Sequence, residues 1–75
     1  MNTEHISDED LKEVGEYFNF DDIENIYDIA GVKKALTDYS KGVDSFDYES
    51  YYNDFRNWWK SLTNEERRNI VNQME

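Results

Sequence analysis

The segment from residue 47 to residue 62 constrains the fold of this chain more than any other part of the sequence. At about 100° per residue, its large apolar side chains fall within an arc of about 120° on a helical wheel, and they are Tyr48, Tyr51, Tyr52, Phe55, Trp58, Trp59 and Leu62. Every Asp, Glu, Asn, Arg, Lys and Ser of the segment lies outside that arc. The pattern predicts a helix with one wide aromatic face, with Asp47 as its N-cap and Phe46 and Tyr51 as a hydrophobic staple.

Capping signals predict where the first and last helices begin. Ser7 stands before a helix that we expect over residues 8–18, with Asp10 completing a weak capping box. Thr63 opens a stronger capping box that ends at Glu66. The last helix is therefore expected to start at Thr63.

Residues 22–40 carry two apolar faces that point in opposite directions. One face holds Ile23, Ile26, Tyr27 and Ala30, and the other holds Ile29, Val32, Ala35, Leu36 and Tyr39. One straight helix would then be apolar nearly all round. We expect two shorter helices, near 22–30 and 32–40, that turn at a left-handed Gly31.

These elements predict an all-α fold: one domain over residues 1–75, built as a small bundle of four or five short helices. No segment alternates between apolar and polar residues between turn glycines, as a strand would. A chain this short has no cysteine to staple it, but 16% of its residues are aromatic, which supplies a core. A homodimer would enlarge that core and stays an open alternative.

Few residues are suited to catalysis or metal binding. The chain has no cysteine and a single histidine, His5. His5 lies in an N-terminal stretch that we expect to fray, so it is poorly placed for a zinc site or a catalytic triad. Calcium loops need ligands at alternate positions, whereas Phe46 and Tyr48 occupy those positions after Asp44. The remaining carboxylates are predicted to lie on polar helix faces. We therefore expect no enzyme, no metal and no cofactor.

The chain shows no sign of a membrane segment or a signal peptide. It has no run of about 18 apolar residues, and residues 1–10 carry acids where a signal peptide is basic and apolar. A cytoplasmic protein is the expectation, in the host cytoplasm if a phage encodes it.

A helix-turn-helix regulator is one alternative, because residues 26–35 resemble that motif. Ala30, Gly31 and Val32 suit its turn, but Tyr27 stands where close helix contact needs a small residue. The net charge of -10 also repels phosphate, which supplies most nucleic-acid affinity. Direct nucleic-acid binding is not expected.

The negative charge is concentrated in the first third of the chain. Residues 1–28 hold ten acids and one base, Lys12, whereas residues 29–75 hold eight acids and seven bases. Like charges stand three or four residues apart, as in Glu9 with Glu13 and Glu24 with Asp28, and such pairs destabilise a helix. A solvated face with acids near helix N-termini is the simple explanation, but it does not account for Glu13, Glu16 or Asp28.

The alternative is that this surface imitates nucleic acid. Four helical residues advance about 6 Å, close to the spacing of phosphates along a strand. The candidate surface consists of Glu9, Asp10, Glu13, Glu16, Asp21, Asp22, Glu24 and Asp28. In size, acidity and lack of cysteine, and in the acidic run from Asp8 to Asp28, the chain resembles the DNA-mimic inhibitors that bacteriophages and mobile elements encode against host enzymes. The resemblance implies a basic nucleic-acid-binding partner: a nuclease, glycosylase, sliding clamp, polymerase or repressor.

The aromatic face supports a rival hypothesis. A small bundle has difficulty burying so many large rings, and Tyr and Trp are common in interface hot spots. The chain would then be a structural, assembly or adaptor protein that binds a partner or a second copy of itself. The candidate contact residues are Tyr51, Tyr52, Trp58 and Trp59.

Overall fold

The computed structural model describes residues 3–33, 36–40, 42 and 45–74, and the regular secondary structure of this part of the chain is helical apart from one isolated bridge between Ser40 and Phe46. Its elements are α1 (Asp8–Glu13), a 3₁₀ helix (Val14–Glu16), α2 (Phe20–Ala30), a second 3₁₀ helix (Leu36–Tyr39), α3 (Tyr48–Ser61) and α4 (Asn64–Gln73). The all-α prediction is confirmed, with four α-helices in the described residues. None of the described helices has the length and apolar character that a bilayer crossing requires.

The predicted N-caps are confirmed at Ser7, Asp47 and Thr63, whose side chains accept the backbone N–H three residues further on. Thr63 and Glu66 form the full capping box in both directions. The predicted staple is also formed, since the Phe46 and Tyr51 ring centroids lie 5.6 Å apart. A further capping box, of Asn19 with Asp22, was not predicted, and it starts α2 at Phe20, two residues earlier than expected.

The first helix is shorter than predicted because a tryptophan interrupts it. The indole Nε1 of Trp59 donates to the Leu11 carbonyl at 3.1 Å. In a continuing α-helix that carbonyl would accept from Gly15 instead. The chain therefore tightens into a 3₁₀ turn at Val14–Glu16, and the expectation of one helix over 8–18 was wrong beyond Glu13.

The helix expected near 32–40 is not formed, although the turn at Gly31 is confirmed. Gly31 has φ 73° and ends α2, and the Val32 N–H bonds to the Tyr27 carbonyl, which closes a Schellman-type cap. After that cap, the described residues form only the 3₁₀ helix Leu36–Tyr39, and residues 34–35 lie outside the description. The helix-turn-helix alternative needs a second α-helix here, and the described residues of this stretch do not form one.

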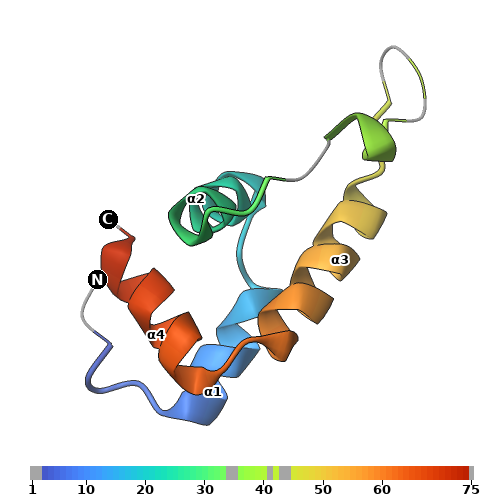
Figure 1. Cartoon of the computed structure of the whole chain (residues 1–75). Coiled ribbons are helices and arrows are strands. Elements are labelled where there is room, and N and C mark those ends of the chain that lie inside the picture. Colours follow the sequence, from blue (N-terminus) through green and yellow to red (C-terminus); the bar gives the residue numbers. More distant parts are fainter. Residues whose placement is uncertain (1–2, 34–35, 41, 43–44, 75) are drawn as a thin grey trace.

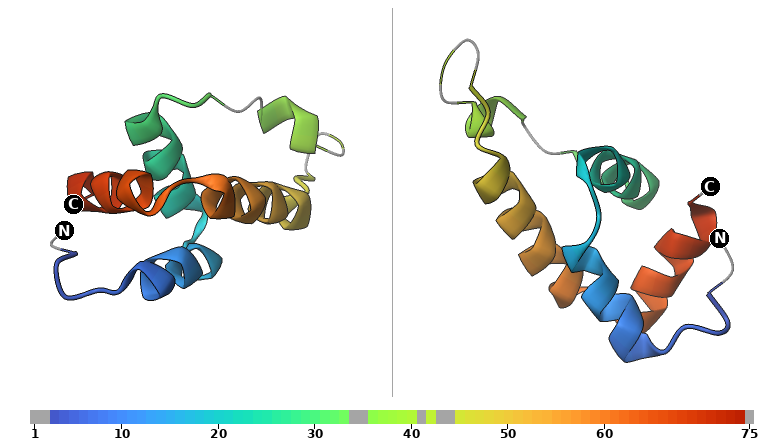
Figure 2. Two further views of the ribbon diagram at one scale, coloured as in Figure 1. Left: turned by 60° about the horizontal axis from the view of Figure 1, so that its bottom comes forward. Right: turned by 180° about the vertical axis from the view of Figure 1, so that it is seen from behind.

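Helices α3 and α4 form the two arms of a V (Figure 1). Helix α1 lies at the corner and packs against α4, while the following 3₁₀ helix packs against α3. Helix α2 crosses the mouth of the V and packs against α4, and its C-terminal end lies on the opposite side of the V from α1 (Figure 2, left). The molecule is elongated, with extents of 43 × 19 × 17 Å.

The core takes only one half of the aromatic face of α3. Tyr51, Phe55 and Trp59 are at most 1% exposed, whereas Tyr52 and Trp58 are half-buried and Tyr48 is exposed. The fold covers Trp59 completely, and it covers Tyr51 except where that side chain lines a hollow between α2 and α3, so the expectation that both rings belong to a broad dimer or partner face was wrong. Tyr52 and Trp58 remain accessible to a partner.

Two arginines of α4 donate hydrogen bonds to backbone carbonyls of other segments, Arg67 at the end of α3 and Arg68 in the N-terminal stretch. Arg67 is 3% exposed and donates to the backbone carbonyls of Trp59, Lys60 and Leu62, where α3 ends. Arg68 donates to the carbonyls of Thr3 and Ile6 and pairs with Asp8, which fixes the N-terminal stretch against α4.

Candidate functional site

The eight acids of the candidate surface lie on ordered helical backbone but not in one row. Four belong to α1 and the 3₁₀ turn after it, and four belong to α2. All are exposed except Asp22, which is half-buried. Because α1 lies at the corner of the V and α2 crosses its mouth, the structure separates them into two groups (Figures 1 and 2).

Two of the eight acids also have structural partners. Asp22 caps α2 through the Asn19 N–H, at 3.4 Å. The carboxylate of Glu16 lies 3.7 Å from the Nζ of Lys60 on α3. These two positions serve the fold, so they are poor choices for testing a binding surface.

Helix α2 presents three carboxylates on its outward side. At about 100° per residue, Asp21, Glu24 and Asp28 fall within about 60° of one another. The opposite side of the helix holds Ile23 and Ile26, which are buried in the core. Core packing therefore fixes the rotation of α2 and directs this group of acids outward.

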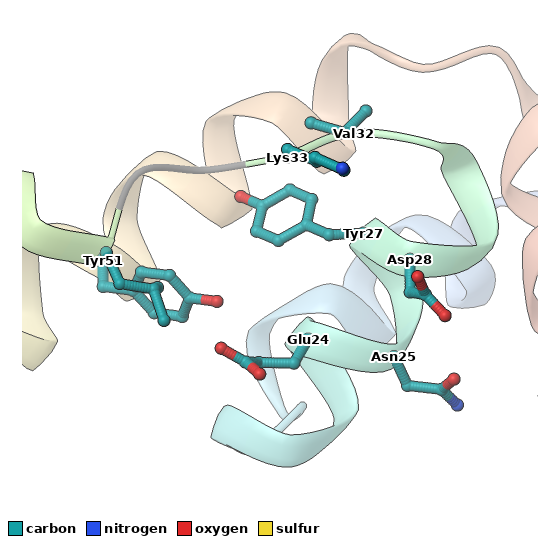
Figure 3. Close-up of a pocket in the computed structure, with 8 residues that line it drawn as sticks. Glu24, Asn25, Tyr27, Asp28, Val32, Lys33 and Tyr51 are labelled. Atoms are coloured by element: carbon teal, nitrogen blue, oxygen red, sulfur yellow. The ribbon is translucent and has the colours of Figure 1, made fainter.

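Beside this group, a hollow of about 500 Å³ lies between α2 and α3. Glu24, Asn25 and Asp28 line it from α2, Tyr51 from α3, and Lys33 from the segment after α2 (Figure 3). Tyr27 also lines it, and its ring stands at 77° to that of Tyr51, with 6.3 Å between the centroids. Tyr27 and Tyr51 were predicted to lie on apolar faces, and their place beside Glu24 at one hollow was not predictable, because it depends on how α2 lies against α3.

The surroundings of three tyrosines favour the neutral phenol. Burial raises the pKa of Tyr51 to about 12, and the Glu24 carboxylate adds to the rise. Burial likewise raises the pKa of Tyr27 above its ordinary value. The hydrogen bond from the Tyr39 hydroxyl to Asp54, at 2.7 Å, raises the pKa of Tyr39 to about 12.

These tyrosines predict alkaline unfolding. An unfolded tyrosine loses its proton near pH 10, whereas Tyr39 and Tyr51 keep theirs in the fold to about pH 12. The folded state thus binds more protons in this window, and the free energy of unfolding falls as pH rises from about 10 to 12. Urea titrations at stepped pH should show this loss, with a smaller one in Tyr51→Phe. A constant free energy across the window would contradict the expectation.

A second, smaller hollow of about 320 Å³ lies where α2, α3 and α4 meet. Trp58, Leu62 and Ile70 supply apolar walls, and Glu66 and Asn69 of α4 also line it. Because Trp58 lines this hollow, it is only half-buried, whereas Trp59 is fully buried in the core. Nothing in the described part of the chain covers it.

No three His, Cys, Asp or Glu side chains gather as a metal site in the part of the chain that the structure describes. His5 lies in an exposed turn before α1. Comparison of the chain with protein-family models, curated proteins and solved structures gave no match. Function is therefore inferred from the geometry and charge of the chain itself.

Proposed function

We propose that the protein is a non-enzymatic binding module that uses its acidic helices to occupy the nucleic-acid site of a basic protein. The observation that carries the proposal is the outward group on α2, where Asp21, Glu24 and Asp28 stand on one side of a helix held by the core. Fixed carboxylates resemble backbone phosphates in charge, and a preorganised anionic surface associates fast with a cationic groove. The acids of α1 form a second negative group at the corner of the V.

The arrangement in two groups refines what such a partner must look like. A straight row would fit a single groove, whereas α1 and α2 lie on different sides of the V (Figure 2). A basic cleft that encloses the molecule, or a groove that engages the α2 group alone, matches this geometry. The partner classes that fit are a nuclease, glycosylase, sliding clamp, polymerase or repressor with a basic channel.

The test compares two variants with the same net charge. Glu13→Gln/Glu24→Gln/Asp28→Asn neutralises exposed acids of α1 and α2, and Asp38→Asn/Glu49→Gln/Glu65→Gln neutralises exposed acids elsewhere. Purified members of the five partner classes are titrated with each protein, with duplex DNA as competitor. We expect one class to bind wild type, with about tenfold weaker binding for the first variant, because three exposed charge contacts contribute about 0.5 kcal/mol each.

Two results would overturn the proposal. One is equal weakening by both variants, which would mean that only overall charge matters. The other is binding that duplex DNA does not displace, because the two would then occupy different sites. Circular dichroism of each variant checks that the fold is intact.

The second candidate function, assembly through the aromatic face, is favoured by the half-buried Trp58 at the smaller hollow. It predicts that Trp58→Ala weakens self-association or partner binding and that the neutralised acids do not. Analytical ultracentrifugation at several concentrations distinguishes the two functions. A monomer that keeps its partner after Trp58→Ala would exclude this candidate.

A further inference from the structure

The hollow between α2 and α3 combines acceptor groups on two sides. Glu24 and Asp28 stand one turn apart on the α2 wall, and the side chain of Tyr51 enters from the α3 wall (Figure 3). Glu24 and Tyr51 therefore line the same space, and the Glu24 carboxylate adds to the rise in the pKa of Tyr51.

The hydroxyl of Tyr51 is an acceptor without a partner within the described residues. Its side chain is 1% exposed, yet it makes no hydrogen bond to any of them. No fully buried polar side-chain atom in the described part of the chain lacks a partner. The hydroxyl must therefore reach the water in the hollow that Tyr51 lines.

The chemistry of these walls selects a cation. An anion would meet Glu24 and Asp28, and an apolar group would leave the Tyr51 hydroxyl unpaired. A guanidinium or ammonium group satisfies both the carboxylates and the phenol, because it donates hydrogen bonds to both kinds of oxygen. A volume of about 500 Å³ leaves room for a long side chain.

We propose that this hollow receives an arginine or lysine side chain of the protein partner, with Glu24 and Asp28 binding the charge and Tyr51 accepting a hydrogen bond. The proposal rests on the proposed function, since a basic nucleic-acid site supplies such side chains. It adds a specific insertion point to what would otherwise be a diffuse charged contact. It also assigns Tyr51 a role that its burial alone does not require.

Replacing Lys33 tests the proposal through a variant that is expected to bind a cation more tightly. Its side chain also lines the hollow (Figure 3), and among the described residues that line it Lys33 is the one base. An ammonium there repels an incoming cation. Lys33→Gln is therefore expected to tighten binding about two- to fivefold, as removal of one exposed like charge allows.

The probe is the capped tripeptide acetyl-Gly-Arg-Gly-amide, with the same peptide carrying citrulline as its uncharged control. Both are titrated into the whole chain and followed by NMR shifts of the backbone and tyrosine rings. We expect shifts centred on Glu24, Asp28 and Tyr51 for the arginine peptide and none that saturate for citrulline. Glu24→Gln and Tyr51→Phe should each weaken binding at least threefold, whereas Glu49→Gln and Tyr48→Phe, outside the hollow, should not.

The results separate this proposal from the proposed function. Shifts spread evenly over α1 and α2, or equal binding of the citrulline peptide, would overturn the insertion point. A partner that duplex DNA displaces, but that binds Tyr51→Phe as tightly as wild type, would keep the proposed function and reject the insertion. Specific binding of the arginine peptide, together with no partner that duplex DNA displaces, would keep the insertion point and reject the proposed function.

Discussion

Replacing Gly15 by alanine is expected to destabilise the protein by about 3 kcal/mol, in the upper part of the range for overpacked cores. A methyl group at this position would overlap Cδ1 of Trp59 and stand 2.9 Å from both Cγ and Nε1. The indole cannot retreat easily, because it is fully buried and donates to the Leu11 carbonyl. At an exposed helical position, replacing glycine by alanine would stabilise the protein by about 0.5–1 kcal/mol. A loss of stability would therefore show that the Trp59 indole lies directly against Gly15. Urea unfolding followed by circular dichroism measures it.

A double-mutant cycle provides the control for Gly15→Ala. Trp59→Phe replaces the indole that the new methyl group meets with a smaller ring, which no hydrogen bond to the Leu11 carbonyl holds in place. In that background the alanine should cost less than about 1 kcal/mol, because residues in direct contact do not behave additively. An unchanged cost would show that the glycine is required for another reason.

Local signals predicted much of this fold. The three caps at Ser7, Asp47 and Thr63 were correct because a side-chain oxygen that accepts an N–H three residues away needs only neighbouring residues. The aromatic helix was correct because its periodicity covers four turns. Gly31 was correct because a left-handed helix end has a strong residue preference.

Contacts between distant residues account for what the sequence could not predict. Nothing near Gly15 indicates that Trp59 will press on it, so the early end of α1 was missed. The apolar residues after Gly31 were assigned to a helix, although Tyr39 instead packs its ring 5.2 Å from that of Tyr51. Both errors come from contacts with α3, which periodicity within one segment does not show.

The candidate site was predictable in composition but not in shape. The acids of residues 9–28 were visible as a charge asymmetry, and they do lie on ordered, outward positions. Their separation into two groups depends on the crossing of α2 over the V. The hollow was not predictable at all, because it needs Glu24 from one helix and Tyr51 from another.

Replacing Arg67 by methionine is expected to destabilise the protein by about 3 kcal/mol, because buried carbonyls that lose a charged donor each cost about 1–3 kcal/mol. The guanidinium donates to the Trp59 carbonyl at 2.9 Å, to Lys60 at 3.2 Å and to Leu62 at 2.5 Å, and it also reaches Asn64 at 2.7 Å. Its positive charge stands at the negative end of α3, which compensates for its burial. Methionine keeps the apolar stem but leaves these carbonyls at the end of α3 without the guanidinium donors.

Two further variants show whether this network is responsible. Arg67→Lys keeps the charge, but one ammonium cannot span carbonyls that a planar fork reaches, so it should recover less than half of the loss. Arg56→Met makes the same substitution on α3, where the arginine donates to Asn53 and lies over the Tyr52 ring, and it should cost less than about 1 kcal/mol. Urea midpoints that are equal for Arg67→Met and Arg56→Met would show that the α3–α4 corner does not depend on Arg67. A larger loss in Arg67→Met, at an unchanged m-value, would show that this one side chain holds the two arms of the V in place.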